Sequence, residues 1–229
     1  MPIKYHYDID QGGNAWFEAR LGVVTASKMN LLLTPGGKPA KNEKVLDYAY
    51  KIVGERATWR MDYEYQGFEM ERGQIEEDLA RNIYNDKYAD VRLCGFVENT
   101  DYGFKIGASP DGLVGDDGGI EIKSRLTKFQ IKTVVEDVID PQYMNQIQAC
   151  LLITGRKWWD FVQYSNGMPL YVKRVLPDPV IHAAIIEACA AFEATCKDIK
   201  AKYMKNSETL VVAPYVENVM GDEIKGSEE

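Results

Sequence analysis

The hydrophobic positions of this chain follow two periods. Spacings of three and four residues, as in Val45, Ala49, Ile52 and Val53, predict amphipathic helices, and short alternating or continuous apolar runs predict strands. The predicted helices cover residues 14–21, 25–34, a segment that begins at Asn42, and then 68–84, 141–154 and 179–205; the predicted strands cover 91–98, 104–108, 120–124, 158–164 and 170–175. This order predicts an α/β fold in which a mixed central sheet is flanked by helices.

Several boundaries carry their own chemical signals. Asp140-Pro141 and Asp178-Pro179 each place a capping carboxylate before a proline in the first turn of a helix. Gly155 follows the first of these helices and ends it. Thr25 is a candidate cap for residues 25–34. The helix over 68–84 carries Ile75, Leu79 and Ile83 on one stripe.

Composition describes an ordinary globular protein, with 229 residues, 45% hydrophobic and 27% charged. We expect a single domain over residues 1–206, followed by a tail over 207–229 whose acidic end is disordered. No uncharged apolar run approaches the roughly 20 residues of a membrane span, and the N-terminus carries no apolar signal region. These features predict a cytoplasmic protein with no membrane partner.

The charge and the reactive side chains exclude several functions. A net charge of −8 argues against a protein that coats nucleic acid, but not against an enzyme that uses metal ions. The four cysteines are scattered and are predicted to be free and buried. With two histidines in the chain, a histidine-rich metal centre and a histidine base are not expected.

One stretch concentrates candidate chemistry. Alternation along the strand over 120–124 points two isoleucines into the core and points Glu121 and Lys123 together to the other face. The loop over 115–119 predicts a hairpin between this strand and the one over 104–108. If these strands pair, Asp111 lies beside Glu121.

Two neighbouring carboxylates repel each other unless a cation lies between them. Hard oxygen ligands suit Mg²⁺ or Mn²⁺, and the carbonyl of Ile122 could add a further ligand. With Lys123 to stabilise a hydroxide or transition-state charge, the set suits phosphodiester hydrolysis. The alternative is a solvated hairpin in which Glu121 and Lys123 pair and Asp111 lies in a turn.

The segment S-P-D-G followed by E-I-K resembles the PD-(D/E)xK nuclease superfamily. More narrowly, about residues 12–205 resemble the lambda-type phage exonucleases, which are 5′-to-3′ alkaline exonucleases of phage recombination. The resemblance implies a restriction-endonuclease-like core whose site holds Asp111, Glu121 and Lys123.

A second stretch, residues 16–27, is similar to the family segment W-x3-R-x-G-x2-T-A-S. The resemblance implies that Arg20 and Ser27 bind the terminal 5′-phosphate of DNA, with Thr25 beside them. Guanidinium and hydroxyl groups suit that role because they donate to phosphate oxygens. The alternatives are a surface arginine near a helix end and a helix-capping serine.

Two further motifs complete the resemblance. Glu77 matches the family's G-x3-E and is implied to bind or orient a second metal; Glu76 is adjacent, and an exposed pair of Glu77 with Arg81 is the alternative. Tyr143 and Gln146 share a helix face in a segment similar to the family's Q-x-Q helix, where Gln146 would support Lys123 or the attacking water.

Other segments are candidates for DNA contact. Arg125, Lys128 and Lys132 follow the strand over 120–124 and could track the phosphate backbone, or be a solvated face. The aromatic segment 59–68 could hold a wedge that splits the duplex.

The resemblance implies a Mg²⁺-dependent 5′-to-3′ exonuclease on linear double-stranded DNA. It would release 5′-mononucleotides and leave a 3′ overhang for single-strand annealing. The metal ligands would be Asp111, Glu121, Glu77 and the Ile122 carbonyl, with two ions for each site. The implied partners are DNA ends, an annealing protein and two further copies in a ring-shaped homotrimer, within the cytoplasm of a bacterial host. The alternatives are an endonuclease or repair nuclease of the same superfamily, and a non-catalytic DNA-end binding protein.

Overall fold

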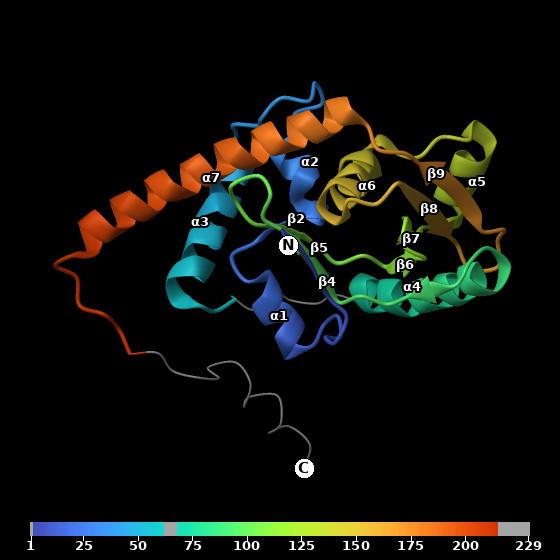
Figure 1. The fold of residues 1–229 in the computed structure, drawn as a ribbon, viewed down its shortest axis with the longest axis horizontal. Helices are drawn as coiled ribbons and strands as arrows, with labels where there is room; N and C mark the ends of the chain where they lie inside the picture. The colour runs from blue at the N-terminus through green and yellow to red at the C-terminus, as the bar shows by residue number, and fades with distance from the viewer. Residues whose placement is uncertain (1, 62–67, 215–229) are drawn as a thin grey trace, which may run out of the picture.

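The computed structural model describes residues 2–61 and 68–214. Its elements follow in the order β1 (Ile3–His6), α1 (Asn14–Arg20), β2 (Val24–Thr25), η1 (Ala26–Lys28), α2 (Met29–Leu32), α3 (Glu43–Thr58), α4 (Phe68–Lys87), β3 (Val91–Arg92), β4 (Phe96–Asn99), β5 (Ile106–Ala108), β6 (Gly112–Val114), β7 (Gly118–Ser124), α5 (Thr127–Glu136), α6 (Pro141–Thr154), β8 (Trp158–Tyr164), β9 (Tyr171–Val175) and α7 (Pro179–Ser207) (Figure 1). The predicted mixed α/β fold is confirmed.

The strands form two sheets, where the pattern predicted one. The first sheet has the order β1-β4-β5-β2 and the second has the order β3-β6-β7-β8-β9. Both sheets are mixed, because β2 pairs with β5 and β7 pairs with β8 in parallel, while the other pairs are antiparallel. The chain passes from the second sheet to the first after β3 and returns after β5.

These passages correct two predictions. Residues 91–98 are not one strand, because β3 and β4 belong to different sheets. A Cβ atom at Gly95 would lie 2.2 Å from the carbonyl oxygen of Ile9, so glycine permits the close approach of the chain between these strands. The predicted hairpin partner, residues 104–108, was also wrong: β5 pairs with β4 and β2, and β6 pairs with β7.

Helices cover both faces of the second sheet. On one face, Ile120 and Ile122 of β7 pack with Val162 of β8 against Ala80 and Tyr84 of α4. The opposite face joins the main core through side chains of β6, β8 and α6, which are Leu113, Trp159, Phe161, Ile147 and Leu151. The prediction that the two isoleucines of β7 face a core is confirmed, with exposures of 0% and 4%.

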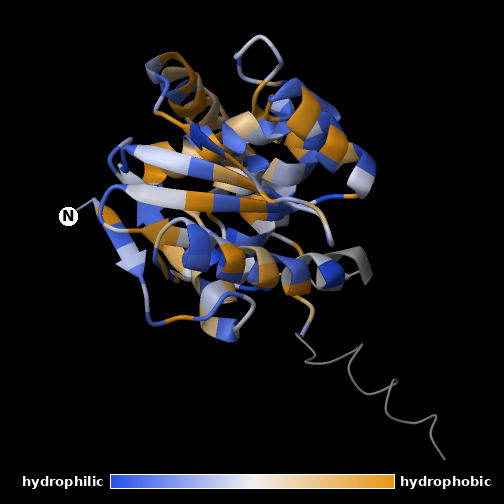
Figure 2. Cartoon of the chain, turned by 90° about the vertical axis from the view of Figure 1, so that its right-hand side faces the viewer, coloured by the Kyte–Doolittle hydropathy of each residue, from blue (hydrophilic) through white to orange (hydrophobic). Residues whose placement is uncertain are grey.

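The helix predicted over 68–84 is present as α4, but its apolar stripe does not form the core contact. Ile75, Leu79 and Ile83 are 66%, 48% and 41% exposed. Figure 2 shows hydrophobic and hydrophilic residues alternating along this helix. Small Ala80 and long Tyr84 fit against the sheet instead, and the Tyr84 hydroxyl donates to Asp160 at 2.7 Å.

The predicted helix over residues 25–34 is divided. Val24 and Thr25 form β2, η1 follows as a short 3-10 turn, and α2 covers Met29–Leu32. Thr25 precedes η1 in extended conformation, but its side chain makes no capping hydrogen bond. The pattern also missed β1, β6 and α5.

The caps of the last two helices are confirmed. Asp140 accepts from the backbone N–H of Gln142, Asp178 accepts from those of Val180 and Ile181, and Gly155 ends α6 with a φ of +66°. The four cysteines are free and buried, as predicted.

Helix α7 is long and apolar enough to cross a membrane by length and composition alone. One such helix is weak evidence for a membrane span, since core helices of globular proteins meet the same test. Ile185, Cys189 and Phe192 of α7 are buried in the main core. The helix ends at Ser207, close to the predicted end, and the acidic end of the predicted tail lies outside the described residues.

Candidate active site

The β6–β7 hairpin brings the first two carboxylates together. Gly112 pairs with Ile120, so Asp111 lies opposite Glu121 in the same register. The Asp111 carboxylate accepts from the backbone N–H of Ile122 at 2.6 Å. Glu121 is 1% exposed, and its Oε1 lies 2.6 Å from the Lys123 ammonium. The adjacency predicted for Asp111 and Glu121 is therefore present, although β6 supplies it.

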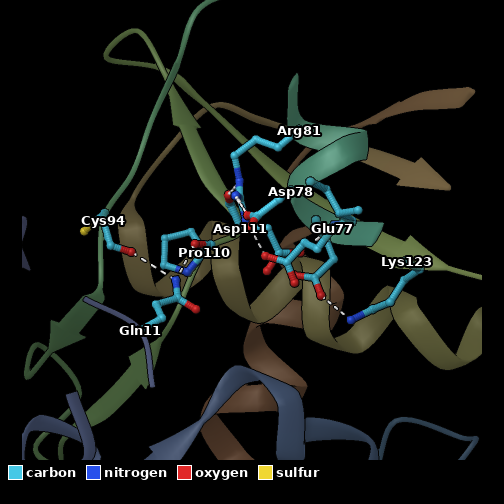
Figure 3. Close-up of polar contacts among 10 residues, drawn as sticks. Gln11, Glu77, Asp78, Arg81, Cys94, Pro110, Asp111 and Lys123 are labelled. Carbon is cyan, nitrogen blue, oxygen red and sulfur yellow. Dashed lines mark hydrogen bonds and ion pairs between the residues drawn. The ribbon is translucent and has the colours of Figure 1, made fainter. Parts of the chain in front are cut away.

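Helix α4 brings Glu77 to the same place (Figure 3). The charges of Glu121 and Lys123 act on its carboxylate. Glu76 points elsewhere, because its carboxylate accepts a hydrogen bond from the Ser124 hydroxyl. We call Asp111, Glu121 and Glu77 the carboxylate cluster.

Burial and mutual repulsion favour protonation within the cluster. Burial, and then the charges of Glu121 and Glu77, hold the pKa of Asp111 well above its ordinary range. Burial also raises the pKa of Glu77, against the opposing effect of Arg81. The cluster thus holds more negative charge than its surroundings stabilise, which is the condition under which a carboxylate site takes up a cation.

Lys123 shows the opposite balance. Burial alone would lower the pKa of its ammonium, but the charges of Glu121 and Asp111 and the hydrogen bond to Glu121 outweigh burial and raise it. Lys123 is therefore held in its charged form. Its ammonium partly neutralises the cluster in this structure.

Gln146 reaches the cluster from α6. Its side-chain N–H donates to Glu121 Oε1 at 2.5 Å, so it contacts the carboxylate rather than Lys123. The other oxygen, Glu121 Oε2, is buried and has no hydrogen-bond partner among the described residues. A buried carboxylate oxygen that accepts no hydrogen bond has lone pairs available for a ligand.

The cluster fits a hard divalent cation by its donor chemistry. Its carboxylates and the Ile122 carbonyl supply oxygen ligands of the kind that Mg²⁺ and Mn²⁺ prefer. In residues 2–61 and 68–214, however, no group of three or more His, Cys, Asp and Glu side chains is already arranged to hold a metal ion. One reason is visible in the contacts, because Lys123 and Gln146 both occupy Glu121 Oε1.

A cavity of about 170 Å³ opens beside the cluster. Its lining residues come from α1, β2, η1, the segment after β5, and α6, and they are Trp16, Arg20, Thr25, Ala26, Ser27, Ser109, Gln146 and Cys150. We call it the Arg20 pocket. It brings together Arg20, Thr25, Ser27 and Gln146, all of which the sequence singled out.

Hydrogen bonds arrange the polar wall of the Arg20 pocket. The Arg20 guanidinium donates to the Ser109 hydroxyl oxygen at 2.7 Å, and the Trp16 indole N–H donates to the same oxygen at 2.8 Å. The guanidinium also lies 4.2 Å from the centre of the Trp16 ring. The hydroxyls of Thr25 and Ser27 are 3.2 Å apart. A guanidinium and hydroxyls around one cavity suit a phosphate group.

Ser109 and Trp16 are pocket residues to which the sequence gave no role. Ser109 is the first residue of S-P-D-G, two positions before Asp111, and this position was the available signal. The segment is further anchored by Gln11, which donates to the carbonyl oxygen of Pro110 at 2.9 Å and to that of Cys94 at 3.2 Å (Figure 3). The Arg20 pocket and the carboxylate cluster therefore share one short piece of backbone.

Tyr143 and Arg125, two further residues predicted to contact DNA, lie near Lys123. The Tyr143 ring stacks on Phe161, and the Lys123 ammonium lies 5.6 Å from the centre of the Tyr143 ring. Arg125 lies 5.8 Å from the Tyr143 ring and 4.2 Å from the ring of Phe129. The segment predicted to contain a wedge lies mostly outside the described residues.

Fold and site together define an α/β protein in which a carboxylate cluster lies beside a pocket lined by an arginine. Residues 15–157, which are more than half of the chain, match the YqaJ-like viral recombinase domain. The chain therefore belongs to the YqaJ-like viral recombinase domain family.

Solved structures agree with this assignment. The alkaline exonuclease LHK-Exo from Laribacter hongkongensis is 32% identical, with a TM-score of 0.70 over 85% of this chain and 100% of that chain. LHK-Exo in complex with dAMP, also 32% identical, gives a TM-score of 0.75 over 87% of this chain and 100% of that chain. A phage-related exonuclease from Haemophilus somnus 129PT, at 11% identity and a TM-score of 0.54 over 79% of this chain and 96% of that chain, shares the fold. No curated protein matches the chain.

Proposed function

We propose that this protein is a Mg²⁺-dependent 5′-to-3′ exonuclease of linear double-stranded DNA. It releases 5′-mononucleotides and leaves a 3′ single strand for phage recombination by annealing. The observation that carries the proposal is the adjacency of the carboxylate cluster and the Arg20 pocket, which share Gln146 and are joined by the segment from Ser109 to Asp111. An exonuclease needs both a hydrolytic centre and a site that recognises the chain end.

The carboxylate cluster would hold the metal. Asp111, Glu121 and the Ile122 carbonyl would bind one Mg²⁺ or Mn²⁺ ion, and Glu77 would bind or orient a second. The buried Glu121 Oε2, which accepts no hydrogen bond from any residue that the structure describes, supports this assignment. When bound, the ions supply Lewis-acid activation of water and of the scissile phosphate.

Lys123 and Gln146 would act on groups around the reacting phosphate. The charged Lys123 ammonium would stabilise the attacking hydroxide or the negative charge that develops in the transition state. Gln146 donates to Glu121 and so orients that carboxylate. Tyr143 and Arg125, which lie beside Lys123, would contact the DNA backbone.

The Arg20 pocket would set the direction of degradation. Its guanidinium, held by Ser109, would pair with the terminal 5′-phosphate, and the hydroxyls of Thr25 and Ser27 would donate to the phosphate oxygens. A phosphate anchored there would place the first phosphodiester bond of the same strand at the carboxylate cluster. The structure of LHK-Exo, which is 32% identical, was solved in complex with dAMP, and this supports a nucleotide ligand for the present chain.

The partners belong to the same proposal. They are double-stranded DNA ends, an annealing protein that takes up the 3′ strand, and two further copies in a homotrimeric ring, in the cytoplasm of a bacterial host. The support for the ring and the annealing protein is the family resemblance.

A labelled-duplex assay tests the activity. Linear duplex carrying a 5′-label or a 3′-label is incubated with the full chain and Mg²⁺, with and without EDTA. The proposal expects rapid release of 5′-labelled mononucleotide, retention of the 3′-label in long strands, and no reaction with EDTA. Cleavage of closed circular duplex would favour an endonuclease. Binding of ends without hydrolysis, unchanged in Asp111→Ala, would favour a non-catalytic protein.

A further inference from the structure

Arg81 on α4 contacts three different groups at the edge of the carboxylate cluster. Its Nε–H donates to the backbone carbonyl oxygen of Asp111 at 2.7 Å. One terminal nitrogen donates to Asp78 at 2.5 Å, and the other pairs with the Glu77 carboxylate. Figure 3 shows the guanidinium between α4 and the start of β6. A single side chain thus links Glu77 to Asp111.

A pair at positions i and i+4 on a helix is ordinarily a solvated ion pair of little consequence. Arg81 differs from such a pair in two respects. Its side chain is 16% exposed, and it bonds to backbone 30 positions away in the sequence. The bond from Nε fixes the plane of the guanidinium, so the face that meets Glu77 cannot swing freely.

This link matters because the cluster comes from separate elements. Asp111 and Glu121 are held together by the β6–β7 register, but Glu77 lies on α4, which packs against the sheet through Ala80 and Tyr84. Packing of apolar side chains sets the helix position but not the orientation of one carboxylate. Arg81 supplies that orientation by bonding to Glu77 and to the backbone of Asp111 at the same time.

We propose that Arg81 is a positioning residue that holds Glu77 and Asp111 at the spacing a pair of divalent cations requires. The inference rests on the proposed function, since it presupposes metal at the carboxylate cluster. Hydrogen-bond partners of metal ligands commonly change metal affinity or activity by 10–100-fold when removed. The charge of Arg81 acts in the other direction, because a cation next to the site repels a metal ion.

The test compares Arg81→Lys and Arg81→Met in the full chain. Arg81→Lys keeps the charge and loses the three-way fork, whereas Arg81→Met loses both. Mn²⁺ binding is measured by electron paramagnetic resonance without DNA, together with the melting temperature of the metal-free protein. Lys87→Met is the matched control, because Lys87 forms an exposed ion pair with Asp86 at the end of the same helix.

We expect Arg81→Lys to bind Mn²⁺ roughly 10–100-fold more weakly than the wild-type chain, and Arg81→Met, which also loses the repelling charge, to be weakened by a smaller factor. The Mg²⁺ concentration for half-maximal exonuclease activity should rise by the same factor, with activity recovered at high Mg²⁺. Lys87→Met should change neither quantity. An unchanged melting temperature of the metal-free variants separates positioning from general damage to the fold, because damage to the fold would lower it.

Unchanged or tighter Mn²⁺ binding in a folded Arg81→Lys protein overturns the inference, and this variant decides if Arg81→Met does not fold. Failure of the proposed function is a distinct result: a wild-type chain that neither binds Mn²⁺ nor degrades DNA overturns both proposals. A wild-type chain that is active, with Arg81 variants of normal metal affinity, overturns only the role of Arg81.

Discussion

The carboxylate cluster and the Arg20 pocket lie side by side and are built in opposite ways. In the cluster, burial and repulsion raise the pKa values of Asp111 and Glu77, and one buried oxygen of Glu121 has no hydrogen-bond partner within residues 2–61 and 68–214. In the Arg20 pocket, the main cationic group is already held by Ser109 and stacked on Trp16. The cluster needs an ion to balance its charge, while the Arg20 pocket is preorganised for an anionic ligand.

This difference suggests a division of labour between chemistry and recognition. A buried site with unbalanced charge suits a reaction step in which charge develops in the transition state. Preorganised hydrogen-bond donors suit the binding of a ligand group, such as a phosphate, whose charge does not change. The four experiments below separate the two regions, in order of expected effect.

Asp111→Asn should remove hydrolysis and leave recognition of the DNA end. An amide is a poor ligand for Mg²⁺, so we expect the rate to fall by roughly 10³-fold or more, since metal activation contributes several kcal/mol. The rate of mononucleotide release measures this effect. Preference for 5′-phosphorylated over 5′-hydroxyl ends, measured by DNA binding, should be unchanged.

The control for that variant is Asp117→Asn. Asp117 is an exposed carboxylate in the same hairpin and forms an ion pair with Lys157. Asp117→Asn should retain the wild-type rate. Full activity of a folded Asp111→Asn protein would remove the carboxylate cluster from the chemistry.

Arg20→Ala should have the converse effect. Loss of a charged hydrogen bond to phosphate costs about 2 kcal/mol, so degradation of 5′-phosphorylated ends should slow by roughly 30-fold. Ends with a 5′-hydroxyl should be degraded at nearly the wild-type rate, and Mn²⁺ affinity should persist. Competition between the two kinds of end in one reaction measures the preference.

Lys28→Ala is the matched control for Arg20→Ala, because Lys28 is basic and nearby in η1 but does not line the Arg20 pocket. It should keep the preference for phosphate. An equal loss on both kinds of end in Arg20→Ala would count against the recognition role.

Ser109→Ala should weaken recognition of the 5′-phosphate by less than Arg20→Ala does. The variant removes one neutral acceptor for Arg20 and Trp16, which contributes about 1 kcal/mol and predicts roughly a fivefold loss on phosphorylated ends. Steady-state kinetics on both kinds of end check it. Ser165→Ala, at a buried serine that does not line the Arg20 pocket, is the control and should have no effect on end preference.

The pH dependence of stability should reveal the unbalanced charge of the cluster. A carboxyl group whose pKa is raised in the folded state stabilises that state at low pH, and this stabilisation is lost as the pH rises through the raised pKa. The pKa values of Asp111 and Glu77 are both raised. One component of the melting temperature of the metal-free protein should therefore decrease as the pH rises above the ordinary pKa range of carboxyl groups. The change should be a few degrees, at roughly 3 °C for each kcal/mol.

Thermal melts across this pH range, with and without Mg²⁺, measure that component. Mg²⁺ should suppress it, since the ion favours the ionised carboxylates. Asp111→Asn should reduce it without Mg²⁺. A component of equal size in wild type and Asp111→Asn would assign it to carboxyl groups elsewhere.

Features that depend on neighbouring residues could be predicted from the sequence. Period-two alternation placed Ile120 and Ile122 in a core and Glu121 and Lys123 on the other face, because successive side chains on a strand point in opposite directions. The caps at Asp140 and Asp178 were equally readable, since each carboxylate bonds to backbone two or three positions away.

Arrangements that depend on distant segments could not be predicted from the sequence and are known only from the fold. The largely apolar segment 91–98 has the same pattern whether it stays in one sheet or crosses between two, so the division into β3 and β4 was not predictable. The exposure of Ile75, Leu79 and Ile83 depends on which side of α4 meets the second sheet.

The same limit applies to the site. The joining of Arg20 and Trp16 to Ser109, and of Arg81 to the backbone of Asp111, connects residues 30 to 93 positions apart. No local pattern encodes such contacts, because chain folding rather than spacing brings the partners within hydrogen-bonding distance. The candidate site residues could be predicted from the sequence, whereas the contacts that orient them depend on the fold.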